Sequence, residues 1–99
     1  MDVISQIGMA AALEQCGEES AELAQACLKM ARKIRGENPT PKTIDELSSN
    51  LVDEIADVLV CVDILLDNDV VSNQDVMHRM LDKHIRWTTR LEEEKSKGE

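Results

Sequence analysis

Apolar or small residues recur at alternating spacings of three and four along two long segments of the chain. The repeat of the first segment consists of Leu13, Cys16, Ser20, Leu23, Cys27, Met30 and Ile34. The repeat of the second segment consists of Ile44, Leu47, Leu51, Ile55, Val58, Val62 and Leu65. This spacing places residues on one side of an α-helix, because about 3.6 residues complete a turn. The pattern therefore predicts two long amphipathic helices.

Local signals set the ends of these two helices. Gly36 is suited to end the first helix, because glycine adopts the left-handed conformation that often follows a helix. Thr43, with Glu46 three residues later, forms a capping-box sequence that begins the second helix. The second helix should end near Asn68.

A short connector, residues 36–42, joins the two helices and contains Pro39 and Pro41. Proline fixes φ and lacks a backbone donor, so neither a helix nor a strand continues through this segment. A connection of this length favours antiparallel neighbours. We therefore expect an antiparallel helical hairpin.

A weaker third repeat follows the hairpin and consists of Met77, Met80, His84, Trp87 and Leu91. Ser72, with Asp75 three residues later, supplies an N-cap sequence for this third helix. The charged tail, residues 92–99, is expected to fray. At the other end, Gly8 is expected to separate a short leading turn, residues 3–7, from the first long helix.

The composition predicts an all-α fold. Trp87 is the only aromatic residue among 99, and the alternation of β-branched and aromatic residues that marks strands is missing. The length suits a single domain, residues 1–99. Long helices with so few residues bury little apolar area by themselves. We therefore expect a three-helix protomer, the hairpin plus a C-terminal helix, that assembles into a four-helix-bundle homodimer or homotetramer.

The charge and the cysteines restrict the partners. With 20 acidic and 11 basic residues, the formal net charge of −9 disfavours nonspecific binding to DNA, RNA or anionic membranes. The sequence also has no apolar run of the roughly 20 residues that a bilayer span requires.

Three cysteines without a Cys-x-x-Cys pair argue against zinc and disulfides. Cys16 and Cys27 share one side of the first helix, and we expect them to be buried free thiols in a cytoplasmic protein.

Two pairs of carboxylates accompany the apolar repeats. Glu19 and Glu22 follow Glu18 in the first helix, and Glu54 and Asp57 lie in the second. Carboxylates three residues apart share a helix face, and oxygen ligands favour a hard cation such as Mg²⁺, Mn²⁺ or Ca²⁺. The alternative is that these residues are ordinary coiled-coil decoration that pairs with Lys and Arg.

The two carboxylate pairs have matching positions on their helices. In each pair, the first carboxylate lies about 60° and the second about 120° from the centre of the apolar repeat, on the same rotational side. When antiparallel helices face each other, equal offsets bring side chains to the same side of the pair. We therefore expect the four carboxylates to converge within about one helical turn. Gly17, just before them, either allows a backbone or ligand to approach closely or is simply tolerated.

The basic residues of the first and third helices can each be interpreted in two ways. Lys29 and Arg32 lie near the end of the first helix, where positive charge complements the helix dipole. A further basic stripe on the third helix consists of Arg79, Lys83, Arg86 and Arg90. It can reach a substrate from a neighbouring subunit or pair with the acidic excess. Trp87, in the apolar repeat of the third helix, can stack a base or anchor an interface.

At its carboxylates the chain resembles the MazG-type all-α nucleoside triphosphate pyrophosphohydrolases. That family is marked by Glu-Glu-x-x-Glu and Glu-x-x-Asp on two antiparallel helices. Here the motifs read Glu18-Glu19-Ser20-Ala21-Glu22 and Glu54-Ile55-Ala56-Asp57. The similarity covers residues 10–91, and the separation between the motifs is long for the family.

The resemblance implies Mg²⁺-dependent hydrolysis, with Mn²⁺ as a second possible metal, of a nucleoside triphosphate to a monophosphate and pyrophosphate. It implies that Glu19, Glu22, Glu54 and Asp57 bind the metal. Glu18 would hold a water, assist a second metal or act as a base. Lys29 and Arg32 match basic residues of the family that would contact phosphates.

Other functions stay open at this point. Phosphoribosyl-ATP pyrophosphatases and deoxynucleotide-specific enzymes share versions of the motif pair. A noncatalytic helical module that binds nucleotide or a protein partner is an alternative of a different class. The complete set of carboxylates argues against the noncatalytic alternative, because such a module has no need of four converging negative charges.

Overall fold

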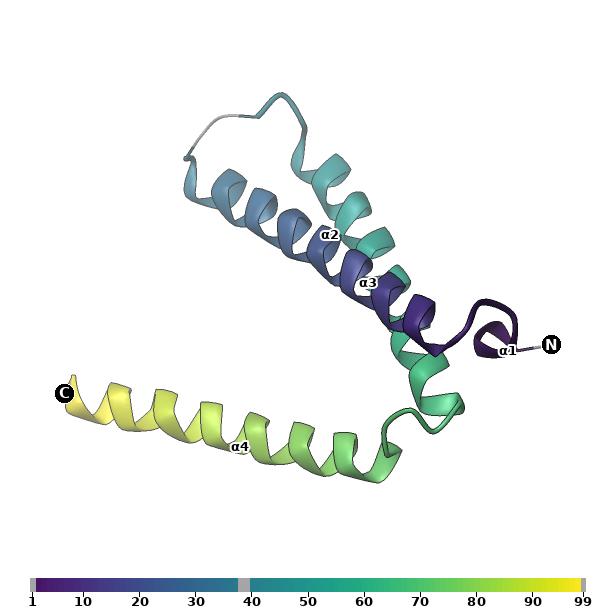
Figure 1. Cartoon of the computed structure of the whole chain (residues 1–99). Helices are drawn as coiled ribbons and strands as arrows, with labels where there is room; N and C mark the ends of the chain where they lie inside the picture. Colours follow the sequence, from purple (N-terminus) through teal and green to yellow (C-terminus); the bar gives the residue numbers. More distant parts are fainter. Residues whose placement is uncertain (1, 38–39, 99) are drawn as a thin grey trace. The chain divides into compact units, whose positions relative to one another are not determined.

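The computed structural model describes residues 2–37 and 40–98, and these residues form helices joined by short connections (Figure 1). The helices are α1 (Val3–Ile7), α2 (Met9–Arg35), α3 (Ile44–Asp67) and α4 (Asn73–Lys97). The all-α prediction is confirmed, and the expected leading turn forms a helix of its own, α1. Asn38 and Pro39 of the predicted connector lie outside the described residues. The chain divides into two compact units, one ending at Asn68 and the other beginning at Asp69.

The predicted N-caps are present at α3 and α4. Thr43 Oγ1 accepts a hydrogen bond of 3.1 Å from the backbone N–H of Glu46, and Glu46 Oε1 accepts one of 3.4 Å from the backbone N–H of Thr43. These reciprocal bonds complete the capping box and satisfy two donors that a helix start leaves free. At α4, Ser72 Oγ accepts a hydrogen bond of 3.2 Å from the backbone N–H of Asp75.

Two glycines end the helices of the N-terminal unit. Gly8, with φ of 89°, separates α1 from α2, and Gly36, with φ of 75°, follows the last residue of α2. Positive φ values are strained for side chains with a Cβ atom, so glycine is required at both positions. The predicted end of the second long helix is also confirmed, because Asn68 caps α3.

Helices α2 and α3 run antiparallel and lie side by side as a hairpin (Figure 1). Among the described residues, the buried apolar side chains are Ala12 and Ala26 of α2 and Leu47 of α3. Alanine at two positions of α2 allows the helix backbones to approach closely. The hairpin core is therefore narrow and built on small side chains.

The side of α2 that faces α3 is shifted from the predicted repeat. Leu13, Ser20, Cys27 and Ile34 were expected in the interface, and all four are exposed. The buried or half-buried repeat is Ala12, Cys16, Glu19, Leu23, Ala26, Met30 and Lys33. This repeat has the same alternation of four and three residues. It contains Ala12 and Ala26, whose small side chains let the two helices pack closer together than Leu13 and Cys27 would. Glu19 consequently lies within the interface instead of beside it.

Helix α3 shows the same kind of shift. Ile44 and Ile55 were expected in the interface, and they are 45% and 42% exposed. The buried or half-buried positions that keep the alternation are Leu47, Leu51, Glu54, Val58, Cys61 and Leu65. Glu54 thus takes an inner position on α3, opposite the one that Glu19 takes on α2.

The structure corrects the expectation for the cysteines of α2 and decides between the two interpretations of Gly17. Cys27 is exposed and Cys16 is half-buried, so the prediction of two buried thiols is wrong, although all three cysteines are free. The shift of the interface to Ala26 explains the exposure of Cys27. A Cβ atom on Gly17 would meet no atom within 4 Å, so nothing in the described part of the chain approaches this glycine closely.

The C-terminal unit contains a single long helix, α4. It continues to Lys97, so the segment expected to fray is helical to within two residues of the end. Acidic residues at 92–94 precede Lys95 and Lys97, an order that complements the helix dipole and favours contacts one turn apart. No helix of the described residues has the length and apolar character needed to cross a membrane.

Candidate functional site

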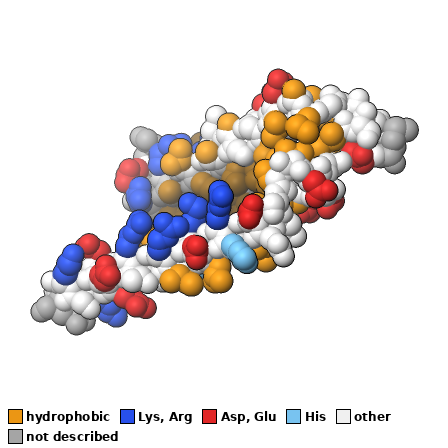
Figure 2. All heavy atoms as spheres, turned by 60° about the horizontal axis from the view of Figure 1, so that its bottom comes forward, with side chains coloured by type: hydrophobic (Ala, Val, Ile, Leu, Met, Phe, Trp, Pro, Cys, Tyr) orange, Lys and Arg blue, Asp and Glu red, His pale blue; other side chains and the backbone are white. Residues whose placement is uncertain are grey.

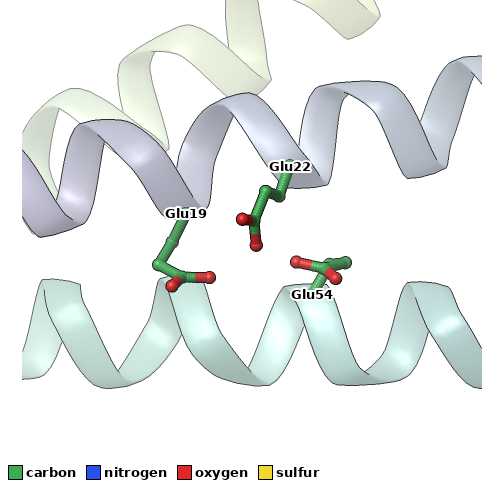
Figure 3. A group of neighbouring side chains, drawn as sticks. All are labelled: Glu19, Glu22 and Glu54. Atoms are coloured by element: carbon green, nitrogen blue, oxygen red, sulfur yellow. The ribbon is translucent and has the colours of Figure 1, made fainter.

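Three carboxylates converge between α2 and α3. Glu19 and Glu22 of α2 and Glu54 of α3 point toward one another (Figure 3). One oxygen from each lies within 4.8 Å of those from the other two. We call these three residues the acidic cluster. The expected meeting of the two distant carboxylate pairs is thus found for three of the four residues.

The geometry of the cluster follows from the helices that carry it. Glu19 and Glu22 are three residues apart on α2, so both side chains leave the same face of that helix. Glu54 reaches the same point from α3, which runs antiparallel. Because Glu19 and Glu54 are half-buried and Glu22 is exposed, the cluster is open on the Glu22 side.

Two oxygens of the acidic cluster are buried without a hydrogen-bond partner. Among the described residues, Glu19 Oε2 and Glu54 Oε2 accept no hydrogen bond. Burying a carboxylate oxygen without a partner is unfavourable, and so is placing three negative charges close together. A divalent cation would offset both costs. The donor set, carboxylate oxygens alone, fits a hard ion such as Mg²⁺ or Mn²⁺.

The pKa of Glu19 reflects its place in the acidic cluster. Loss of hydration raises the pKa of the Glu19 carboxyl above its ordinary value, although the hydrogen bond from Gln15 acts in the opposite direction. The negative charges of Glu22 and Asp57 raise this pKa further. A bound cation would therefore stabilise the ionised form of Glu19, which burial and the neighbouring negative charges disfavour.

Asp57 and Glu18 were also predicted as site residues, and neither joins the acidic cluster. Asp57 is exposed, and its oxygens are not part of the group within 4.8 Å, although its charge acts on the pKa of Glu19. Glu18 is exposed as well. The structure therefore brings Glu19, Glu22 and Glu54 together and leaves Asp57 at the margin.

Lys29 and Arg32, predicted to contact phosphates, lie further along α2. At about 1.5 Å per residue, they are about 10 Å and 15 Å from Glu22 along the helix axis. Lys29 is exposed and Arg32 is half-buried. Arg32 also lies in the last turn of α2, where its carbonyl oxygen accepts a 3.0 Å hydrogen bond from the backbone N–H of Glu37. Arg32 is thus placed as the dipole interpretation requires, whereas Lys29 precedes the last turn, and contact of either residue with phosphate stays a prediction.

Two neighbours of the acidic cluster were missed in the sequence. Gln15 Nε2 donates a hydrogen bond of 2.8 Å to Glu19 Oε1, and the spacing of four residues could have indicated it. Cys61, four residues after Asp57, lies close enough to Glu19 and Asp57 for their charges to act on it. Burial is the main reason that the pKa of the Cys61 thiol is raised.

Gln15 and Cys61 also line a small hollow beside the acidic cluster. The hollow has a volume of about 40 Å³ and is lined by Val3, Ile7, Ala12, Gln15, Cys61 and Ile64. At roughly 10–15 Å³ for each water, it has room for a few water molecules and not for a nucleobase. A base of a nucleotide bound at the cluster therefore needs another surface.

The chain was compared with protein-family models, with curated proteins and with solved structures, and none of the three comparisons gave a match.

Proposed function

We propose that this chain is a magnesium-dependent nucleoside triphosphate pyrophosphohydrolase of the MazG type. It would convert a nucleoside triphosphate and water into a nucleoside monophosphate and pyrophosphate. The observation that carries this proposal is the convergence of Glu19, Glu22 and Glu54, with an oxygen of each within 4.8 Å of the others. Their motif spacing, which resembles that family, supports the choice of reaction.

Electrostatics supports a metal-dependent reaction over direct binding of phosphates by the hairpin. The formal net charge is −9, and the acidic cluster concentrates negative charge at one point. A triphosphate would be repelled from this surface unless cations lay between them. Glu19, Glu22 and Glu54 would hold the ion, and Asp57 at the margin would complete the set. When bound, magnesium neutralises phosphate charge and makes a coordinated water more acidic.

The residues of the chain would then position the reactants. The water oxygen forms a bond to the α-phosphorus, the bond from this phosphorus to the bridging oxygen breaks, and pyrophosphate leaves with the electron pair. Glu18, which is outside the acidic cluster, is the neighbouring carboxylate available to accept the proton of the water. Lys29 and Arg32 would contact the phosphates furthest from the cluster.

The decisive experiment measures pyrophosphate released from a panel of ribo- and deoxyribonucleoside triphosphates and phosphoribosyl-ATP, with and without Mg²⁺. We expect Mg²⁺-dependent release, and we expect Glu54→Gln to abolish it. Asp53→Asn is the matched control, since it removes the neighbouring carboxylate, which is exposed, and should leave turnover within about twofold. If no substrate yields pyrophosphate while Mg²⁺ still raises the melting temperature, the noncatalytic alternative is correct.

Self-association is part of this proposal. Helix α3 is apolar on a second face, where Val52, Leu59 and Val60 are 64%, 57% and 58% exposed. Exposed apolar side chains that line one face are typical of an interface. A homodimer or homotetramer would cover them, and sedimentation equilibrium over a range of protein concentrations would determine the assembly. A monomer at all concentrations would refute this part.

A further inference from the structure

Helix α4 separates its basic side chains from its apolar ones. Arg79, Lys83, Arg86 and Arg90 follow one another at spacings of four, three and four, which places them on one side of the helix. Lys and Arg side chains gather in a row along α4 (Figure 2). Residues 76–91 contain these four basic residues and one acidic residue, so this segment carries +3 in a chain whose total is −9. The positive charge of this segment is therefore concentrated on one face of α4.

Three of these basic residues and the only aromatic residue of the chain line one hollow. Lys83, Arg86, Trp87 and Arg90 line an open hollow of about 180 Å³, and we call this hollow the cationic groove. Trp87 had been expected in an apolar repeat with Met80 and Leu91, whereas its indole borders the groove. The indole is 67% exposed, so its surface is accessible to a ligand.

The chemistry of the cationic groove fits a compact ligand with several negative charges. Arginine offers two parallel N–H donors to a phosphate, and lysine adds a compact charge. Three cations around one hollow repel one another, so a ligand with two or more phosphates gains more there than a single carboxylate. An exposed indole in addition stacks on a nucleobase, whose flat face it matches.

We propose that the cationic groove of α4 binds the oligophosphate chain of a nucleotide, with the base against Trp87. The groove belongs to α4 alone, and this binding requires neither a metal in the acidic cluster nor hydrolysis. It therefore holds or fails independently of the proposed function. The ligand class is the same, since a nucleoside di- or triphosphate supplies both the phosphates and the base.

A second occupant with complementary charge is the acidic hairpin surface of another copy of the chain. A helix with its side chains is about 10–12 Å wide, so the helical surface of a second copy cannot enter a hollow of about 180 Å³, and only single carboxylate side chains would reach into it. A short chain of phosphates brings several charges into 180 Å³, and a helix surface does not. The geometry therefore favours the oligophosphate, and the experiment below distinguishes the two occupants.

Tryptophan fluorescence gives a direct test, because Trp87 is the only Trp and the chain has no Tyr or Phe. The full chain, in EDTA to remove divalent cations, is titrated with inorganic tripolyphosphate, with ATP and with adenosine. We expect a saturable change of emission with tripolyphosphate and with ATP, tighter binding of ATP, and weakening of both by salt. Adenosine, which lacks phosphates, should bind far more weakly.

Matched variants distinguish binding in the cationic groove from a general effect of net charge. The double variant Arg86→Gln/Arg90→Gln should weaken binding by at least about tenfold, since charge-assisted hydrogen bonds to phosphate are lost. Lys95→Gln/Lys97→Gln removes two positive charges from the same helix outside the groove and should change affinity by less than about twofold. Trp87→Leu, followed by calorimetry, should abolish the preference for ATP over tripolyphosphate. Circular dichroism verifies that each variant keeps its helix content.

Three results would overturn the proposal. The first is the absence of any saturable change with tripolyphosphate and ATP. The second is an equal loss of affinity in the two double variants, which would show that only net charge matters. The third is a Trp87 emission that depends on protein concentration without ligand and loses this dependence at high salt, which would assign the groove to a second copy of the chain.

Discussion

Gln15 holds the carboxylate of Glu19 by a hydrogen bond of 2.8 Å from Nε2 to Oε1, one turn earlier on α2. This bond occupies one oxygen of Glu19 and leaves the other, Oε2, buried without a partner on the side of the acidic cluster. Gln15 thus orients the carboxylate, and the remaining oxygen is available for a cation. Where a residue orients a metal ligand in this way, its mutation typically lowers metal affinity by about 10- to 100-fold.

Removal of this orienting bond should weaken metal binding. We expect Gln15→Ala to reduce the affinity for Mn²⁺ by about tenfold, because Glu19 is then free to rotate away from the cluster. Isothermal titration calorimetry measures the effect. Gln74→Ala, at an exposed position of α4, is the control and should bind Mn²⁺ like the unmodified chain. Equal affinities for the Gln15 variant and the control would show that the bond plays no orienting role.

The unpartnered carboxylate of Glu54 should destabilise the chain when no metal is bound. We expect Glu54→Gln to raise the free energy of unfolding of the metal-free chain by about 1 kcal/mol, because it removes a charge from an inner position of the hairpin. Asp53→Asn, next to it and exposed, should have little effect. Urea denaturation in EDTA measures both. A Glu54→Gln chain less stable than the parent would contradict this account.

The pKa of Glu19 determines how stability responds to pH in the absence of metal. Because this pKa is raised in the folded chain, the folded state retains the proton of Glu19 to a higher pH than the unfolded state does. The contribution of Glu19 is therefore complete at acid pH, below the ordinary value near 4.5, and is lost as pH rises through the folded pKa. The chain should lose stability in this range, and Glu19→Gln should remove that part of the loss.

The measurement for Glu19 is the free energy of unfolding from urea denaturation in EDTA, between about pH 4 and about pH 7. Glu14→Gln removes a charge from an exposed position of the same helix and should keep the slope of the parent. The Glu19 explanation fails if both variants give the same slope.

The capping box of α3 should contribute measurably to stability. Thr43→Ala removes the acceptor of the 3.1 Å bond from Glu46 and should cost about 1 kcal/mol. Thr89→Ala, in the interior of α4, removes a hydroxyl where no cap is needed and should be neutral or slightly stabilising. Chemical denaturation of both variants compares the two positions, and equal losses would exclude a specific role for the cap.

The cysteines should differ in reactivity. Cys27 is exposed, whereas Cys61 is half-buried and its thiol has a raised pKa because of burial. Since the thiolate is the reactive form, Cys61 should react with iodoacetamide several times more slowly than Cys27 at neutral pH. Mass spectrometry of peptides taken at successive times measures both rates. Equal rates would mean that the hairpin opens at Cys61 faster than alkylation occurs.

Helix ends could be predicted from the sequence because they depend on neighbouring residues. Thr43 with Glu46, Ser72 with Asp75 and Gly36 each act within one turn, so their roles are fixed locally. The order of helices and the antiparallel hairpin followed from these ends.

Which face of each helix is buried in the hairpin was harder to predict. The first long helix offers two overlapping repeats, one through Leu13 and Cys27 and one through Ala12 and Ala26. Hydrophobicity favours the former, whereas close packing of two helices favours the latter, and only the partner helix decides between them. The convergence of Glu19 and Glu54 was predicted from their equal offsets from the two apolar repeats, and it is found because the buried face of each helix is shifted toward its carboxylates. The marginal place of Asp57 follows from the same shift, because Glu54 takes the inner position on α3 and Asp57 is left exposed beside it.

The narrow core of the hairpin affects how the chain behaves on dilution. With two alanines and one leucine as its buried apolar side chains in the described segments, the hairpin removes little apolar surface area from solvent. In the proposed homo-oligomer, contacts between copies would then supply a large share of the folding free energy. The melting temperature should consequently rise with protein concentration, and a sample diluted to nanomolar concentration should unfold at a lower temperature than a micromolar one.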